Sequence, residues 1–382
     1  MGWMVFCLAC VAGIVAVLLY ARLAPRPSSP RSVGGVDLPT ELISSVPQGP
    51  FVLFANGAPG SLFGRVAIEK LPLGTGPRPI APLACERVHY AAGIGVCMTT
   101  DESRLPARSF AELFDASFKR THVIPLTGSP IRARVSPDGR RAALTVFETG
   151  HSYSDASFST RTIVIETASG RSLGDLEDFT VRKDGVPFKA IDFNFWGVTF
   201  GRDGDTFYAT LKTGGERYLI KGSIDARAAA VVRTGVECPS LSPDGTLIVF
   251  KKPLTQEVGW RLHVLDLASG VERPLNQVRR SVDDQVDWFD ASHVVYHDSA
   301  PEGSGVWLLA VDGVSGPRLL VPYAHSPAVA REPELPRGRL PVSRLRTPPA
   351  QSGGLTGVIR QWQYPAPASV KVVPATGLNS HW

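Results

Sequence analysis

Two histidines near the end of the patterned part of the chain have a spacing that suits metal binding. His293 and His297 are four residues apart on an expected strand, so both side chains would face the same way, and Asp298 follows them. The three residues would supply half of a metal site. A solvated strand face explains the same pattern, and the metal assignment stays open.

A group of aspartates just upstream suggests a second kind of chemistry. Carboxylate oxygens are preferred ligands of Ca²⁺, and loops that converge on one axis can gather them for Ca²⁺ or for a basic peptide. Turn capping and solvation account for the group equally well. We expect no other cofactor. The group consists of Asp283, Asp284, Asp287 and Asp290.

A long excursion between Glu148 and Trp196 is rich in polar and aromatic residues. Insertions in repetitive folds usually map to loops on one face, which is often the binding face. We therefore predict a ligand or partner surface there, with a loop that covers a sheet edge as the alternative. The candidate residues are His151, Tyr153, Arg161, Asp192, Asn194 and Trp196, together with Asp283 and Asp284 of the acidic group.

Cys85 and Cys97 flank an expected hairpin over residues 88–93. Residues twelve apart across such a turn can meet as cross-strand neighbours and form a disulfide in an oxidising compartment. Two buried thiols are the alternative, and Cys238 is left unpaired in either case.

The sequence motifs of common enzyme classes are missing. There is no G-x-S-x-G elbow, no P-loop, no dinucleotide fingerprint and no H-E-x-x-H. We therefore assign no catalytic residue.

The elements that would position these residues follow a repeated turn-and-strand pattern. The turns at residues 136–139 and 242–245 both read Ser-Pro-Asp-Gly and precede an apolar strand, and residues 201–204 and 288–291 are weaker copies. Proline presets φ, aspartate caps the turn, and glycine supplies a positive φ. Two earlier copies end near Gly49 and Gly93, which brings the count to six.

The copies recur mostly every 41 to 46 residues, with a gap of 65 where the excursion lies. A period in the forties made of strands and turns is typical of propeller blades. We predict an all-β fold, a six-bladed β-propeller with four-stranded antiparallel blades, over residues 49–330. We further expect residues 51–54 and the segment around 319–321 to share the blade that closes the ring.

Several sequence segments within this repeated pattern resemble those of a known family. Residues 85–88, 129–145, 194–200, 237–244 and 283–286 are similar to segments of TolB-like six-bladed β-propellers, in particular the bacterial TolB-like translocation protein group. The Ser-Pro-Asp-Gly turn is shared by propellers of many functions, so it specifies the fold more than an activity. The resemblance implies a protein-binding propeller of the cell envelope and brings no established chemistry.

The flanks differ from the propeller in composition. The formal net charge of the chain is +5, but residues 331–382 carry +5 and Arg22, Arg26 and Arg31 add +3, which leaves residues 32–330, the propeller with the end of its linker, at −3. A mildly acidic domain is not expected to bind nucleic acid. The tail over residues 331–382 is rich in proline and arginine, so we predict that it is disordered and either solvated or in contact with a partner or a lipid surface.

The N-terminus contains 18 uncharged residues from Trp3 to Tyr20. This length predicts a transmembrane helix, so we divide the flank into an anchor over residues 1–21 and a Pro/Ser-rich linker over 22–48. A cleaved signal peptide is the alternative, and Pro25 disfavours cleavage. The arginines after the span favour a cytoplasmic propeller, whereas the cysteine pair and the resemblance favour an extracytoplasmic one, which we predict without excluding the other side.

The sequence thus predicts a membrane-anchored, non-catalytic β-propeller that binds a protein or peptide of the cell envelope. The alternative is a propeller enzyme, either a metal-dependent lyase or a hydrolase acting on acidic oligosaccharide. Three histidines that converge on one axial pocket would favour the enzyme, and scattered histidines would favour binding.

Overall fold

The computed structural model describes residues 38–148, 159–254, 259–300 and 303–331. The predicted anchor, most of the linker and the tail lie outside these ranges, as do His151 and Tyr153. Within the described ranges no helix is long and apolar enough to cross a membrane.

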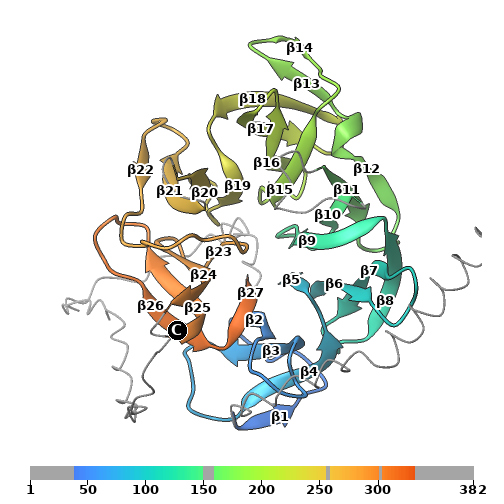
Figure 1. Cartoon of the computed structure of the whole chain (residues 1–382), viewed down its shortest axis with the longest axis vertical. Helices are drawn as coiled ribbons and strands as arrows, with labels where there is room; N and C mark the ends of the chain where they lie inside the picture. The colour runs from blue at the N-terminus through green and yellow to red at the C-terminus, as the bar shows by residue number, and fades with distance from the viewer. Residues whose placement is uncertain (1–37, 149–158, 255–258, 301–302, 332–382) are drawn as a thin grey trace, which may run out of the picture. The chain divides into compact units, whose positions relative to one another are not determined.

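Six β-sheets are arranged as blades around a common axis, so the predicted six-bladed β-propeller is confirmed (Figure 1). Blade 1 contains β5 (Arg87–Ala91), β6 (Ile94–Asp101), β7 (Arg108–Asp115) and β8 (Arg120–Leu126). Blade 2 contains β9 (Gly128–Val135), β10 (Arg141–Glu148), β11 (Thr160–Glu166) and β12 (Ser172–Asp175). Blade 3 contains β15 (Asn194–Phe200), β16 (Thr206–Thr213), β17 (Glu216–Ser223) and β18 (Ala228–Thr234).

The remaining blades complete the ring. Blade 4 contains β19 (Glu237–Leu241), β20 (Leu247–Pro253), β21 (Trp260–Asp266) and β22 (Glu272–Pro274). Blade 5 contains β23 (Asp287–Trp288), β24 (His293–Ala300), β25 (Gly303–Ala310) and β26 (Arg318–Pro322). Blade 6 contains β27 (Ala324–Ala330), β2 (Phe51–Asn56), β3 (Arg65–Lys70), β4 (Arg78–Ala84) and β1 (Thr40–Leu42).

Two blades depart from the predicted four antiparallel strands. β1 pairs in parallel with β4 and comes from the range expected to be linker. In blade 3, a short 3₁₀ turn (Leu176–Asp178) leads into the hairpin of β13 (Thr180–Lys183) and β14 (Val186–Phe188), and β13 pairs in parallel with β18. Part of the excursion is therefore an outward extension of blade 3, visible at the top of Figure 1.

The ring closes by pairing between the two ends of the domain, but one strand later than predicted. Phe51 to Asn56 pair with Ala324 to Ala330, whereas residues 319–321 belong to β26 and pair with β25 in blade 5. The reason is that a single residue, Tyr323, separates β26 from β27, so that the segment around Ser326 becomes the innermost strand of blade 6. Every residue of β2 is buried, because it lies between β27 and β3.

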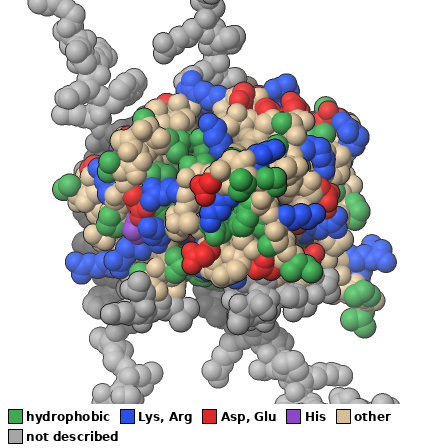
Figure 2. Space-filling model, turned by 90° about the horizontal axis from the view of Figure 1, so that it is seen from above, with side chains coloured by type: hydrophobic (Ala, Val, Ile, Leu, Met, Phe, Trp, Pro, Cys, Tyr) green, Lys and Arg blue, Asp and Glu red, His purple; other side chains and the backbone are tan. Residues whose placement is uncertain are grey.

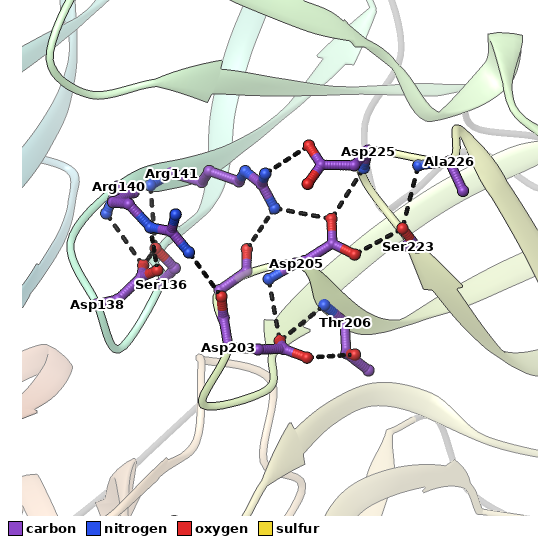
Figure 3. Close-up of polar contacts among 11 residues, drawn as sticks. Ser136, Asp138, Arg140, Arg141, Asp203, Asp205, Thr206, Ser223, Asp225 and Ala226 are labelled. Carbon is purple, nitrogen blue, oxygen red and sulfur yellow. Dashed lines mark hydrogen bonds and ion pairs between the residues drawn. The ribbon is translucent and has the colours of Figure 1, made fainter. Parts of the chain in front are cut away.

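The repeated turns join neighbouring blades, as Figure 3 shows for blades 2 and 3. Arg141 bonds Asp205 at 2.8 Å and Asp225 at 2.6 Å, and Arg140 donates to the main-chain oxygen of Asp203 at 2.9 Å. Gly204 has φ of +68°, and a Cβ there would lie 2.2 Å from the Asp138 carboxylate. The aspartate and glycine of the motif therefore serve the contact between blades as well as the turn itself.

Candidate functional site at the propeller axis

We call the side of the ring that carries these repeated turns the turn face and the opposite side the loop face. The innermost strand of each complete blade ends in such a turn, so it runs from the loop face to the turn face. A 12-residue link between β22 and β23 leads to the axis, where residues 283–288 lie among the innermost strands. We call residues 283–288 the axial segment.

Two side chains of the axial segment donate hydrogen bonds to three different blades. Gln285 donates from Nε2 to the carbonyl of Val88 at 3.1 Å in β5 and to that of Pro327 at 2.9 Å in β27. Trp288 donates from Nε1 to the carbonyl of Ser240 in β19 at 2.9 Å. Blades 1, 4 and 6 are thus joined through one stretch of chain.

Asp287, toward the turn face, is fully engaged by its surroundings. Its carboxylate accepts hydrogen bonds from Arg134 at 2.9 Å and from the backbone N–H of Val329 at 2.8 Å. Burial acts to raise the pKa of Asp287, but Arg134, with help from Arg331 and the backbone N–H of Val329, outweighs it and holds that pKa below its usual range. The carboxylate therefore remains ionised inside the ring.

His89 lies beside this pair and is neutral. Its Nδ1 accepts the backbone N–H of Val135 at 3.1 Å, and its Nε2 lies 3.8 Å from Asp287. Burial, helped by the charge of Arg134, lowers the pKa of His89 to about 3. This histidine is a structural acceptor at physiological pH.

Asp284 is also held by the domain. It accepts the backbone N–H of Ser326 at 2.6 Å. Burial opposes its ionisation, but Arg87 and Arg132 lower the pKa of Asp284 to about 2. Like Asp287, it carries a charge that the protein itself neutralises.

Asp283, at the loop-face end, is bound differently. Its main-chain oxygen accepts hydrogen bonds from both Arg132 and Lys251. Its carboxylate lies 3.4 Å from Arg132 and 3.5 Å from Lys251, and 48% of the side chain is exposed. Both cations are buried, with only 8% and 1% of their side chains exposed, and burial lowers the pKa of Lys251.

A cavity of about 20 Å³ lies beside the axial segment, large enough for about one water molecule. Arg132, Arg134, Gly197, Cys238 and Gln285 are among its lining residues. Gly197 and Cys238 have φ of +65° and +49°, and both fall where the register of an innermost strand shifts. A Cβ at Gly197 would lie 2.7 Å from the Cα of Cys238, so glycine is required where these strands approach.

The structure brings the predicted aspartates to the axis but not as a metal site. Asp283, Asp284 and Asp287 bond to cations and backbone groups of the chain, and Asp290 caps the turn before His293. His297 lies with His325 at a ring separation of 6.3 Å, away from His293. Among the described residues, no group of three or more His, Cys, Asp or Glu is arranged to hold a metal ion.

The candidates from the excursion do not meet in one place. Arg161 pairs with Asp175 at 2.6 Å, and Asp192 accepts hydrogen bonds from Thr213 and Gly214 in the neighbouring loop. Asn194 and Trp196 are buried in β15, with 6% and 3% exposure, so they position that strand and do not form part of an exposed surface. His151 and Tyr153 lie outside the described residues.

Cys85 and Cys97 are joined by a disulfide with 5.3 Å between their Cα atoms. Cys85 follows β4 of blade 6, and Cys97 lies in β6 of blade 1. The bond therefore fastens the closing blade to the next one. Cys238 is free.

The cations of the axis were missed in the sequence. Arg132 precedes the Ser-Pro-Asp-Gly turn by four residues, the same offset that places Cys238 before the second such turn. Lys251 directly follows an apolar run, Leu247 to Phe250, in the second strand of blade 4. Aligning the repeats by their turns and looking for charges at inward positions would have found both.

No protein-family model and no curated protein matches the chain. Among solved structures, TolB from Acinetobacter baumannii is similar over 74% of this chain and 67% of its own, with a TM-score of 0.53 and 15% identity. A nidogen/laminin complex matches over 74% and 98% with a TM-score of 0.48 and 13% identity, and an acylaminoacyl peptidase over 72% and 45% with a TM-score of 0.43 and 12% identity. At these identities the similarity shows the propeller fold alone.

Proposed function

We propose that this chain is a membrane-anchored, non-catalytic β-propeller that binds a protein or peptide of the cell envelope through its loop face. The observation that carries the proposal is the state of the axial charges. Arg134, Asp284 and Asp287 hold blades together and are saturated by the chain itself, whereas the exposed part of the axial cluster opens on the loop face at Asp283.

Exposed apolar side chains on the same face support binding. Phe63, Leu105 and Ile191 are 63%, 101% and 107% exposed, and each lies in a loop that connects strands at this face. Phe63 additionally contacts the ring of His325 at 6.3 Å. Together, Phe63, Leu105 and Ile191 supply apolar area on one face that a protein partner can bury.

The point where the chain leaves the propeller agrees with this orientation. Ala330 pairs with Phe51, whose ring contacts Tyr90 next to the turn at residues 91–94. The last described strand, β27, therefore ends at the turn face, opposite the proposed binding face.

The surface and the cysteines support the kind of partner and the compartment. Figure 2 shows acidic, basic and hydrophobic side chains interspersed on the visible face, without a field of one sign. Such a surface favours a protein partner over nucleic acid. The Cys85–Cys97 disulfide favours an oxidising compartment, and hence an extracytoplasmic propeller.

The test is crosslinking in the native membrane with a surface variant and a matched control. Replacing Phe63, Leu105 and Ile191 together by serine should abolish a specific crosslinked partner. Replacing Val123, Val271 and Val314, which are also exposed but lie outside the loop-face tips, should leave it intact. Equal loss in both variants, or no partner with the wild type, would contradict the proposal.

A further inference from the structure

We propose that Arg132 and Lys251 form a carboxylate-binding site at the loop-face mouth of the axis, which the chain occupies with its own Asp283. A partner carboxylate would replace the Asp283 carboxylate there. This inference rests on the proposed function, since it names the chemistry of the partner that reaches the loop face.

The two cations are built into the domain as a pair. Arg132 comes from the innermost strand of blade 2 and Lys251 from the second strand of blade 4, so two blades direct buried charges at one point. Arg132 is also fixed by a hydrogen bond of 2.7 Å to the carbonyl of Ile131. Removing a long cationic side chain from water is costly unless an acceptor meets it, so the geometry requires an anionic or carbonyl acceptor here.

The main-chain oxygen and the carboxylate of Asp283 meet the two cations at different distances. Its main-chain oxygen supplies the close contacts, while its carboxylate stands 3.4 Å and 3.5 Å from the two cations. Charge-assisted hydrogen bonds between such groups are usually about 2.7–2.9 Å long. A partner carboxylate that takes the place of the Asp283 carboxylate would make these closer contacts.

The link that presents Asp283 is long but anchored, so the exchange requires only the Asp283 side chain to withdraw. The link before it has 12 residues, whereas the corresponding links before β5 and β9 have two and one. Val278 and Val282 are buried and hold it, and Val282 bonds the carbonyl of Trp260 at 3.2 Å. Neither amide atom of Gln277 has a hydrogen-bond partner among the described residues.

The local charges favour exchange of a carboxylate over simple addition or loss of one. Arg87, Arg132 and Lys251 face Asp283 and Asp284 at this mouth, and the nearby Glu237 is paired with Arg217 at 2.7 Å, so one positive charge is in excess. Withdrawal of the Asp283 side chain would raise the excess to two. A partner carboxylate restores the balance, which a neutral partner does not.

The first test uses sodium acetate as the probe and needs no partner. In Asp283→Ala the main-chain oxygen remains, so the domain should fold with the cations in place. About 100 mM acetate should then raise its Tm by about 2–4 °C more than sodium chloride of equal ionic strength, and should do so neither in the wild type nor in Asp283→Ala combined with Lys251→Met. If Asp283→Ala does not fold, Asp283→Asn serves in the same comparison. Equal effects of acetate and chloride in the single variant would overturn the site.

The second test uses a hexaglutamate peptide on the full chain. Asp283→Ala should bind it at least about tenfold more tightly than the wild type, and Lys251→Met should abolish the gain. Unchanged affinity in Asp283→Ala overturns the role of Asp283 as an internal competitor. Stabilisation by acetate with no crosslinked partner in the membrane would keep the anion site and reject the proposed function, so the two failures are distinguishable.

Discussion

Asp283 and Asp287 lie near the two ends of the axial segment and differ in how fully the protein binds their carboxylates. Asp287 is buried, lies 2.9 Å from Arg134 and accepts a backbone N–H from β27, so its charge is fixed between blades. Asp283 is half exposed, and its carboxylate stands more than 3 Å from its cations. Asp287 therefore holds blades together, whereas Asp283, four residues earlier, makes ion pairs that another carboxylate can replace.

The difference shows why a cluster of aspartates is a poor guide to metal binding by itself. Carboxylates that point into a ring of strands need cations or N–H groups, and a propeller can supply these from several blades at once. Only a carboxylate that reaches solvent retains capacity for an external partner. Substitution of Asp287 and of Asp283 in turn tests this difference.

The largest effect is expected from Asp287→Ala, because it leaves Arg134 buried without its anion. Breaking one partner of a buried pair typically costs about 3–5 kcal/mol. Chemical denaturation should show a loss of this size. Replacing Arg134 and Asp287 together by methionine and leucine should lose less than either single change, and strictly additive losses would show that the two residues are not coupled.

The Cys85–Cys97 disulfide links two blades covalently and can be compared with the Arg134–Asp287 ion pair. A bond that closes a loop of this length contributes about 3 kcal/mol. The Cys85→Ala, Cys97→Ala double variant should lose about that amount, measured under oxidising conditions. Reductant should lower the Tm of the wild type toward that of the double variant and leave the double variant unchanged; a wild type insensitive to reductant would speak against the bond.

Acid should destabilise the domain through two buried groups near the axial segment, His89 and Asp284. His89 has a folded-state pKa lowered to about 3, so the unfolded chain takes up its proton first, and stability present above about pH 6.5 is lost as the pH falls. Asp284 has its pKa lowered to about 2, so its contribution is present above about pH 4 and is lost as the pH falls toward 2. Tm measured from pH 7 to pH 3 should fall, and His89→Gln should flatten the part between pH 6.5 and pH 4. An unaltered profile in that variant would contradict the assignment.

The fold was predictable because the residues of the turn motif favour one backbone geometry. Proline, aspartate and glycine in the turns at residues 136–139 and 242–245 specify a hairpin locally, and six copies, mostly 41 to 46 residues apart, specify the ring. The closing strand was misplaced because β26 and β27 are both short, largely apolar strands, separated only by Tyr323. Periodicity alone cannot decide which of two such runs meets the other end of the chain.

The site was less predictable, because it depends on contacts between residues far apart in sequence. Asp283 and Arg132 are brought together by ring closure, and nothing near either residue indicates the other. The reverse holds for Asn194 and Trp196, whose polar and aromatic character suggested a surface although the strand containing them is innermost. A polar side chain in an inner strand more often serves the packing of blades than a ligand.

The smallest stability effect is expected at the open end of the axial segment. Asp283→Ala removes a half-exposed carboxylate but keeps the main-chain acceptor, so the loss should be at most about 1 kcal/mol, as for exposed ion pairs. The measurement is denaturant unfolding beside Asp287→Ala in the same buffer. A loss as large as that of Asp287→Ala would mean that both ends fasten the blades equally, and the distinction between a structural carboxylate and an exchangeable one would then fail.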